Sequence, residues 1–121
     1  MALNKRKFGK KAENIAKSFL MKHGFCVLKD NYQIRFGEID LICLKDNKIH
    51  LIEVKSVSRI TLYKPEDKVD RNKLNKIIGV GEFYINKFDL NKYEIEIGII
   101  CIYLIKDKKP RIKYIRNVIL N

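Results

Sequence analysis

Apolar residues recur along the chain with two periods, one typical of helices and one typical of strands. Helical spacing between Gly9 and Gly24 predicts an amphipathic helix with a glycine C-cap. Its apolar stripe consists of Ala12, Ile15, Ala16, Phe19 and Leu20. A second helical pattern covers Lys64–Lys87 and opens with a proline and two acids. The two glycines inside it each disfavour the helix by about 1 kcal/mol relative to alanine.

Five other segments are apolar, β-branched or alternating, and are predicted to be strands. They are Phe25–Ile34, Glu38–Leu44, Lys48–Lys55, Tyr93–Ile105 and Arg111–Ile115. The first three follow one another closely and form an antiparallel meander, and the fourth is too uniformly apolar to face water. The order α-β-β-β-α-β-β predicts an α/β fold whose central mixed sheet is flanked by helices.

Length and charge narrow the picture further. The 121 residues suit a single domain, 1–121, with residues 1–8 as a flexible basic N-terminus. Lys and Arg number 26 against 14 acids, a formal charge of +12 that favours a polyanionic partner. A chain rich in Lys, Ile and Asn can also reflect a biased genome, so charge alone leaves this open.

Cysteine spacing and hydropathy bear on the compartment. The three cysteines are far apart, without CxxC spacing, and are expected to be reduced core residues. No apolar run approaches the roughly 18 residues that a membrane span requires, and no apolar export segment follows the basic start. We therefore expect a cytoplasmic protein without a membrane partner.

The predicted strand Glu38–Leu44 is otherwise apolar enough to be buried, yet it carries two acidic residues. Glu38 and Asp40 share a face, and so do Glu53 and Lys55 on the following strand. A two-residue turn at Asp46-Asn47 would set Asp40 opposite Glu53 and Glu38 opposite Lys55. Like charges that face each other destabilise a sheet, so this arrangement needs a compensating charge.

Two explanations remain open at this point. A divalent cation would turn the repulsion into ligation, and oxygen ligands suit Mg²⁺ or Mn²⁺. Lys55 would then orient or deprotonate a water and stabilise charge on a phosphate. Alternatively, the four charges form a cross-strand ion-pair ladder on a solvated sheet edge.

"GEIDLI" followed after a short hairpin by "LIEVK" resembles the signature of the PD-(D/E)xK nucleases. The whole chain resembles the YraN family of uncharacterised bacterial proteins, which are predicted endonucleases similar to archaeal Holliday junction resolvases. "GKKAENIAKSFLMKHGF" resembles the family's first helix, and "YKPEDKV" its loop before the second helix. The resemblance implies a restriction-endonuclease-like core and a metal-dependent nuclease that cuts DNA, including branched or structured DNA.

The resemblance also implies roles for individual residues. Asp40 and Glu53 match the metal-binding acids, and Lys55 matches the catalytic lysine. Glu13 matches a helix glutamate that completes such sites, and the Val54 carbonyl is a further candidate ligand. Glu38 belongs to the motif, either as a ligand or as a partner of Lys55 or another basic residue.

Other residues are candidates for binding the nucleic acid, with DNA favoured over RNA. They are Lys5, Arg6, Lys7, Lys10, Lys11 and Lys73. The N-terminal run could instead simply solvate a mobile end, whereas Lys73 also matches the family pattern. Tyr32, Tyr63 and Tyr84 are expected in the core or a cleft wall rather than as base-stacking platforms.

Two alternatives to a nuclease remain, and the sequence departs from the family pattern at one place. The chain could be a non-catalytic nucleic-acid-binding protein, or a protein-binding module whose charge is compositional. As a nuclease it could act as a homodimer to cut two strands. The family usually has an Arg-x-Asp pattern after the second helix, where this chain has Glu96 and Gly98.

Overall fold

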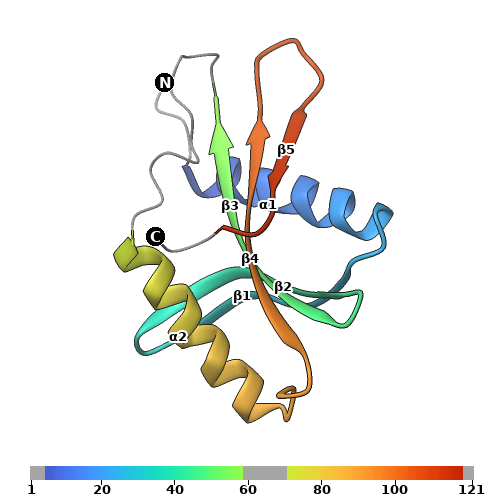
Figure 1. The fold of residues 1–121 in the computed structure, drawn as a ribbon. Coiled ribbons are helices and arrows are strands. Elements are labelled where there is room, and N and C mark those ends of the chain that lie inside the picture. Colours follow the sequence, from blue (N-terminus) through green and yellow to red (C-terminus); the bar gives the residue numbers. More distant parts are fainter. Residues whose placement is uncertain (1–4, 59–70, 119–121) are drawn as a thin grey trace.

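The computed structural model describes residues 5–58 and 71–118, and only the backbone of residues 5–8. The order of the elements agrees with the predicted α-β-β-β-α-β-β (Figure 1). The elements are α1 (Lys5–Lys22), β1 (Cys26–Ile34), β2 (Gly37–Lys45), β3 (Lys48–Val57), α2 (Arg71–Lys87), β4 (Glu94–Tyr103) and β5 (Arg111–Ile115). Within these ranges neither helix is long and apolar enough to cross a membrane.

The strands form one sheet in the order β1-β2-β3-β4-β5. β1, β2 and β3 are antiparallel neighbours, β3 and β4 run parallel, and β5 returns antiparallel to β4. A parallel pair needs a crossover connection, and α2 lies within the connection between β3 and β4. The mixed sheet expected from the sequence is therefore confirmed.

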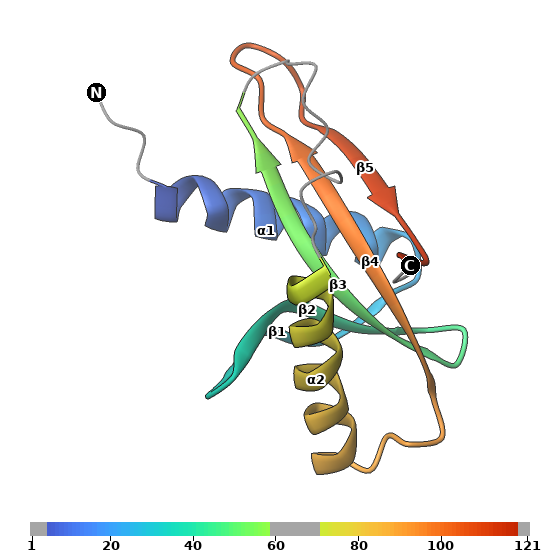
Figure 2. The ribbon, with the colours of Figure 1, turned by 60° about the vertical axis from the view of Figure 1, so that its left-hand side comes forward.

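The helices cover opposite faces of this sheet, as Figure 2 shows. Alternation along β3 separates the faces, because Ile52 belongs to the α1 core and Leu51 to the α2 core. The α1 core consists of Ala12, Ala16, Leu20, Phe25, Leu41, Cys43, Ile52, Ile100 and Ile102. The α2 core consists of Tyr32, Ile39, Ile42, Ile49, Leu51, Ile77, Val80, Tyr84 and Ile85.

Local sequence explains how α1 ends. Gly24 has a φ of 86°, the left-handed conformation that glycine adopts without strain. Its N–H donates to Met21, and the Phe25 N–H donates to Leu20. These two bonds form a Schellman cap, and the Phe25 and Leu20 side chains meet in the α1 core.

The turn between β2 and β3 is also set locally. Asp46 and Asn47 have φ values of 52° and 61°. Two positive values in a two-residue loop define a type I′ turn, whose twist matches a hairpin. Lys45 pairs with Lys48 as predicted, so the sequence determined the hairpin register.

Two details differ from the sequence predictions. α1 begins at Lys5, so residues 5–8 of the expected flexible start are helical, while residues 1–4 lie outside the described range. Cys26 is exposed, whereas Cys43 and Cys101 are buried as expected, and all three are free thiols. The helical pattern before Arg71, and with it Tyr63, lies outside the described residues.

The two glycines of α2 should respond oppositely to substitution by alanine. A Cβ at Gly79 meets nothing within 4 Å, so Gly79→Ala should stabilise the protein by up to about 1 kcal/mol. A Cβ at Gly81 collides with the fully buried Leu51, so Gly81→Ala should destabilise it by about 1–3 kcal/mol. Urea unfolding checks both, and equal effects would contradict this close packing of α2 on β3.

Candidate active site

Asp40 lies where β2 separates from β3. The ladder between these strands runs from the Lys45–Lys48 pair to Leu41 opposite Ile52 and ends there. One step further, the Val54 N–H donates to Asp40 Oδ2 at 2.8 Å. The carboxylate therefore accepts a backbone donor of the neighbouring strand at the end of the ladder.

A pocket opens at this separation, on the side of the sheet that α2 covers. Its volume is about 290 Å³. The lining residues come from β2, β3 and α2, and are Gly37, Glu38, Ile39, Asp40, Ile52, Glu53, Lys73, Lys76 and Ile77. Two of the predicted site acids, Asp40 and Glu53, thus share one cavity with the motif residue Glu38.

Glu53 is the most buried acid of the pocket, with only 7% of its surface exposed. Its Oε1 atom forms ion pairs with Lys73 of α2 and with Lys55, whose Nζ lies 3.4 Å away. Its Oε2 atom is buried without a hydrogen-bond partner in the described structure. One carboxylate oxygen thus pairs with two cations, and the other retains its full capacity to accept a donor or a cation.

The protonation of Asp40 reflects these surroundings. Burial raises its pKa from an ordinary 3.8 to about 6, and the carboxylates of Glu53, Glu38 and Glu13 contribute to the rise. The hydrogen bond from Val54 acts in the opposite direction. The site therefore disfavours the charged form of Asp40 and would gain from a cation beside it.

Lys73 supplies positive charge from α2. Partial burial disfavours its ammonium, but the hydrogen bond and charge of Glu53 outweigh burial and raise the pKa of Lys73. Lys73 was predicted to bind nucleic acid, and the structure places it in the wall of this pocket. Lys76, one turn further along α2, also lines the pocket and was not distinguished by sequence from other basic residues of this helix.

Glu13, on α1, does not line the pocket, but its charge contributes to the raised pKa of Asp40. Its Oε1 accepts a hydrogen bond of 2.8 Å from Asn31 Nδ2 of β1. Asn31 has a φ of 48°, a left-handed kink within the strand. Burial, followed by the charge of Asp30, raises the pKa of Glu13, against Lys17, Lys10 and the Asn31 hydrogen bond.

The end of β2 departs from the predicted alternation. Regular strand alternation would place Ile39 on the same face as Leu41 and Cys43, but Ile39 belongs to the α2 core, whereas those two residues belong to the α1 core. Asp40 was expected opposite Glu53, and Glu38 opposite Lys55, but the β2–β3 ladder ends before it reaches either pair. Glu38 pairs only on its other side, with Gln33 of β1. The physical reason is that the β2–β3 ladder ends at Leu41. Beyond this residue, hydrogen bonds to β3 no longer determine which face of the sheet each β2 side chain occupies.

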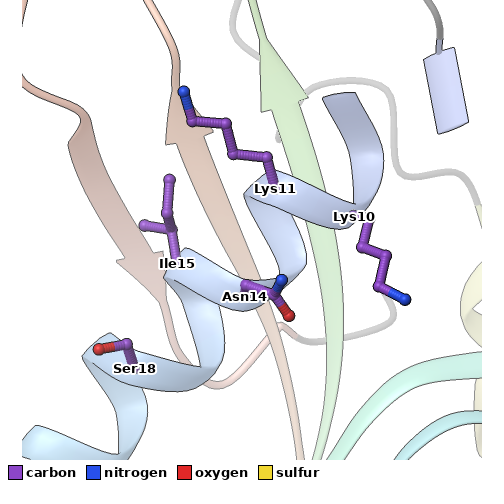
Figure 3. Close-up of a pocket in the computed structure, with 5 residues that line it drawn as sticks. All are labelled: Lys10, Lys11, Asn14, Ile15 and Ser18. Carbon is purple, nitrogen blue, oxygen red and sulfur yellow. The ribbon is translucent and has the colours of Figure 1, made fainter. Parts of the chain in front are cut away.

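The predicted basic residues of α1 separate into two directions. Figure 3 shows Lys10 and Lys11 pointing to opposite sides of the helix, around a cavity of about 490 Å³. Lys10 is close enough to Glu13 to influence its pKa, whereas Lys11 lines a second cavity with Lys106 and Lys108. The side chains of Lys5, Arg6 and Lys7 lie outside the described part.

Glu96 stands where the family usually has its Arg-x-Asp pattern. It is buried in a cluster of charged residues separate from the Asp40 pocket. Arg116 donates to it from Nε at 2.9 Å and from Nη2 at 3.3 Å. His50 Nδ1 lies 3.2 Å from Oε2, and Lys48 Nζ lies 3.8 Å from Oε1. Burial alone would raise the pKa of Glu96, but Arg116, His50 and Lys48 together lower it.

Gly98 has a packing role in the same strand. A Cβ there would come within 2.7 Å of Tyr114 Cε1 and 2.9 Å of its hydroxyl oxygen. Tyr114 therefore packs on the bare backbone of β4. Neither Glu96 nor Gly98 lines the Asp40 pocket, and His50 lies on the α1 side of the sheet, in contact with Phe25.

Within residues 5–58 and 71–118, no three His, Cys, Asp or Glu side chains gather closely enough to form a metal site by themselves. The donor set that remains is a pair of carboxylates with the backbone at Val54. Asp40 disfavours its negative charge, and Glu53 has a buried, unpartnered oxygen. This chemistry fits a hard divalent cation that keeps several waters, such as Mg²⁺ or Mn²⁺.

The chain is thus an α/β protein with a five-stranded mixed sheet. Acidic residues and lysines line a pocket where β2 separates from β3. Residues 12–106 match the model of "Uncharacterised protein family UPF0102". A UPF0102 protein of Campylobacter fetus is 40% identical over 98% of both chains. One from Clostridioides difficile is 36% identical over 95% of this chain and 98% of its own. The chain belongs to the UPF0102 family, also called YraN.

Proposed function

We propose that this protein is a metal-dependent nuclease that hydrolyses phosphodiester bonds in DNA, with a PD-(D/E)xK core. The observation that carries the proposal is the pocket in which Asp40 and the buried Glu53 meet, with Lys55 paired to Glu53. The three residues stand at the divergence of β2 and β3. A hairpin followed by a parallel strand after a helix is consistent with that class of nuclease.

Each residue has a chemical part in this proposal. Asp40 and Glu53 would hold Mg²⁺ or Mn²⁺, with the Val54 carbonyl as a further ligand and Glu13 acting directly or through water. The cation would supply Lewis acidity and a lowered pKa for bound water. Lys55 would hold the attacking water and donate to the phosphate as its negative charge increases.

Lys73 has a second part, which follows from its pairing with Glu53. The Lys73 ammonium, together with that of Lys55, compensates the charge of this buried carboxylate. Lys73 and Lys76 also add positive charge to the pocket wall, where a DNA phosphate would enter. Lys10 and Lys11 would contact the DNA backbone further away.

The decisive experiment compares the native protein with Lys55→Met. With Mn²⁺ present, the native chain should cleave at least one of duplex, flap, single-stranded or four-way DNA. Lys55→Met should cleave the same DNA about 10²-fold more slowly or worse, because it lacks the ammonium that would hold the attacking water and donate a hydrogen bond to the phosphate. Mn²⁺ affinity, measured by calorimetry, should survive in the variant.

Lys92→Met is the matched control, since Lys92 is exposed on the loop between α2 and β4. It should cleave like the native chain. Equal rates for native protein and Lys55→Met, or no cleavage of any DNA on the panel, would reject the catalytic proposal.

A second candidate is a non-catalytic DNA-binding protein, and one observation favours it. Lys55 and Lys73 already neutralise Glu53, so the acids need no metal to be tolerated. This candidate predicts salt-sensitive DNA binding without saturable Mn²⁺ binding. Calorimetry with MnCl₂ therefore separates the two candidates without an activity assay.

A further inference from the structure

Two exposed phenylalanines form a pair beside the acidic pocket. Phe36 lies in the turn between β1 and β2 and is 63% exposed, and Phe83 on α2 is 42% exposed. Their ring centroids are 6.2 Å apart, at 78° to each other. Single exposed apolar residues are ordinary, but two large rings in contact at the surface are a feature to explain.

The pair is fixed in position next to the pocket. Gly37, which follows Phe36, lines the pocket and packs so closely on α2 that an added Cβ would be 3.1 Å from Val80. Lys76, also in the pocket wall, precedes Phe83 by two helical turns and so lies on the same side of α2. The rings therefore continue the wall of the site outward along α2.

We propose that Phe36 and Phe83 form a stacking platform for unpaired bases of the nucleic acid whose backbone enters the Asp40 pocket. This inference rests on the proposed function and adds the substrate class, DNA with a single-stranded segment. Every base has a flat face that can stack on an aromatic ring, whereas bases inside a duplex are already stacked.

Charge complementarity favours a nucleic acid over an apolar protein partner. The chain carries a net charge of +12, and Arg35 directly precedes Phe36. Lys76 lies between the acids and the rings, where a strand bound on both would pass its phosphates. Three acids, Glu38, Asp40 and Glu53, line the same pocket, and of these Glu38 is exposed enough to remain solvated.

The sequence alone did not indicate this pair. Of the three tyrosines named in the sequence analysis, Tyr32 and Tyr84 are 8% and 7% exposed and contact each other in the α2 core, and Tyr63 lies outside the described residues. Phe36 and Phe83 are 47 positions apart, and only the packing of the β1–β2 turn on α2 brings them together.

The test measures DNA affinity without added metal, so that no cleavage is required. Fluorescence anisotropy compares a labelled single strand, a flap and a fully paired hairpin duplex. Phe36→Ala and Phe83→Ala should each weaken binding of the single strand and flap about 5- to 150-fold, since stacking contributes about 1–3 kcal/mol per base. Duplex affinity should change less than twofold, and Phe36→Trp should retain single-strand binding.

Phe88→Ala is the matched control, because Phe88 is 50% exposed just beyond the far end of α2. It should bind all three DNAs like the native chain, and thermal melts should show that every variant is folded. Equal losses for duplex and single strand, or no loss for either variant, would overturn the proposal. A change of oligomeric state in Phe36→Ala, seen by light scattering, would also overturn it and assign the rings to self-association.

These results are distinguishable from failure of the nuclease proposal. If the protein binds single strands through the rings but never cleaves DNA, the platform stands and the catalytic proposal falls. If it cleaves DNA with a rate that is insensitive to both ring substitutions, and single-strand affinity is also unchanged, only the platform falls.

Discussion

Asp40→Asn should abolish DNA cleavage and at the same time make the protein more stable. Asparagine keeps an oxygen that can accept the Val54 N–H, so the local backbone contact remains. It removes the negative charge that a divalent cation would bind. Cleavage with Mn²⁺ should fall by about a thousandfold or more, and Mn²⁺ affinity should fall with it.

The gain in stability follows from the raised pKa of Asp40. A carboxyl group with a pKa of about 6 in the folded state and 3.8 in the unfolded state binds its proton more tightly when folded. The native protein should therefore lose stability as pH rises from about 4 to about 6, and remain less stable above that range. Asp40→Asn lacks this loss, so it should exceed the native chain by about 1–3 kcal/mol at pH 8.

Urea unfolding between pH 4 and pH 8 measures this difference. Asp30→Asn is the matched control, because Asp30 is paired with Lys17 at 2.7 Å and its pKa is lowered. It should be slightly less stable than the native chain at neutral pH, since it loses a surface ion pair. A pH-independent or destabilising effect of Asp40→Asn would show that the site does not disfavour its charge.

Arg116→Ala should destabilise the protein, although Arg116 lies outside the apolar core. It removes the donors on a carboxylate that is 4% exposed, and leaves Glu96 with Lys48 at 3.8 Å and the buried His50. Breaking a buried pair by removing one partner typically costs about 3–5 kcal/mol. Because Arg116 is half-exposed and two basic partners remain, we expect a loss of about 2 kcal/mol.

The loss should depend on pH in a defined direction. The pKa of Glu96 is lowered by its partners, so their stabilisation is present above its ordinary 4.5 and is lost as pH falls through the folded value. Urea midpoints of native protein and Arg116→Ala should therefore converge in acid and separate above about pH 5. Arg111→Ala, at the exposed start of β5, should show no such separation.

A double variant, Glu96→Gln with Arg116→Ala, tests the assignment. In Arg116→Ala the negative charge of Glu96 is buried without its main partner. The double variant has no such charge, so much of the lost stability should return. If the double variant is as unstable as the sum of its two single changes, the interaction between Glu96 and Arg116 is not the cause.

Much of the site was predictable because its parts are local in the chain. The Asp46-Asn47 turn sets the β2–β3 register, and this register carries Asp40 and Glu53 to the same end of the hairpin. Strand alternation placed Glu53 on the face of Leu51, away from His50. The short motifs around Asp40 and Glu53 were enough to indicate the family, and the match of residues 12–106 to its model confirms it.

Other features depended on contacts between distant segments. The end of the ladder at Leu41 moved Ile39 into the α2 core and separated Glu38 from Lys55. The pairing of Lys73 with Glu53 required α2 to lie over this part of the sheet. Arg116 reached Glu96 from the segment after β5, across 20 positions of chain.

The sequence by itself thus determined the order of the elements, the hairpin register and the acids of the site, because periodicity and turn geometry act within a few residues. Only the tertiary structure decided the protonation of Asp40, the partners of Glu53 and the contact of Phe36 with Phe83. Burial, electrostatic coupling and ring contact depend on distances through space, and the packing of α2 on the sheet sets those distances.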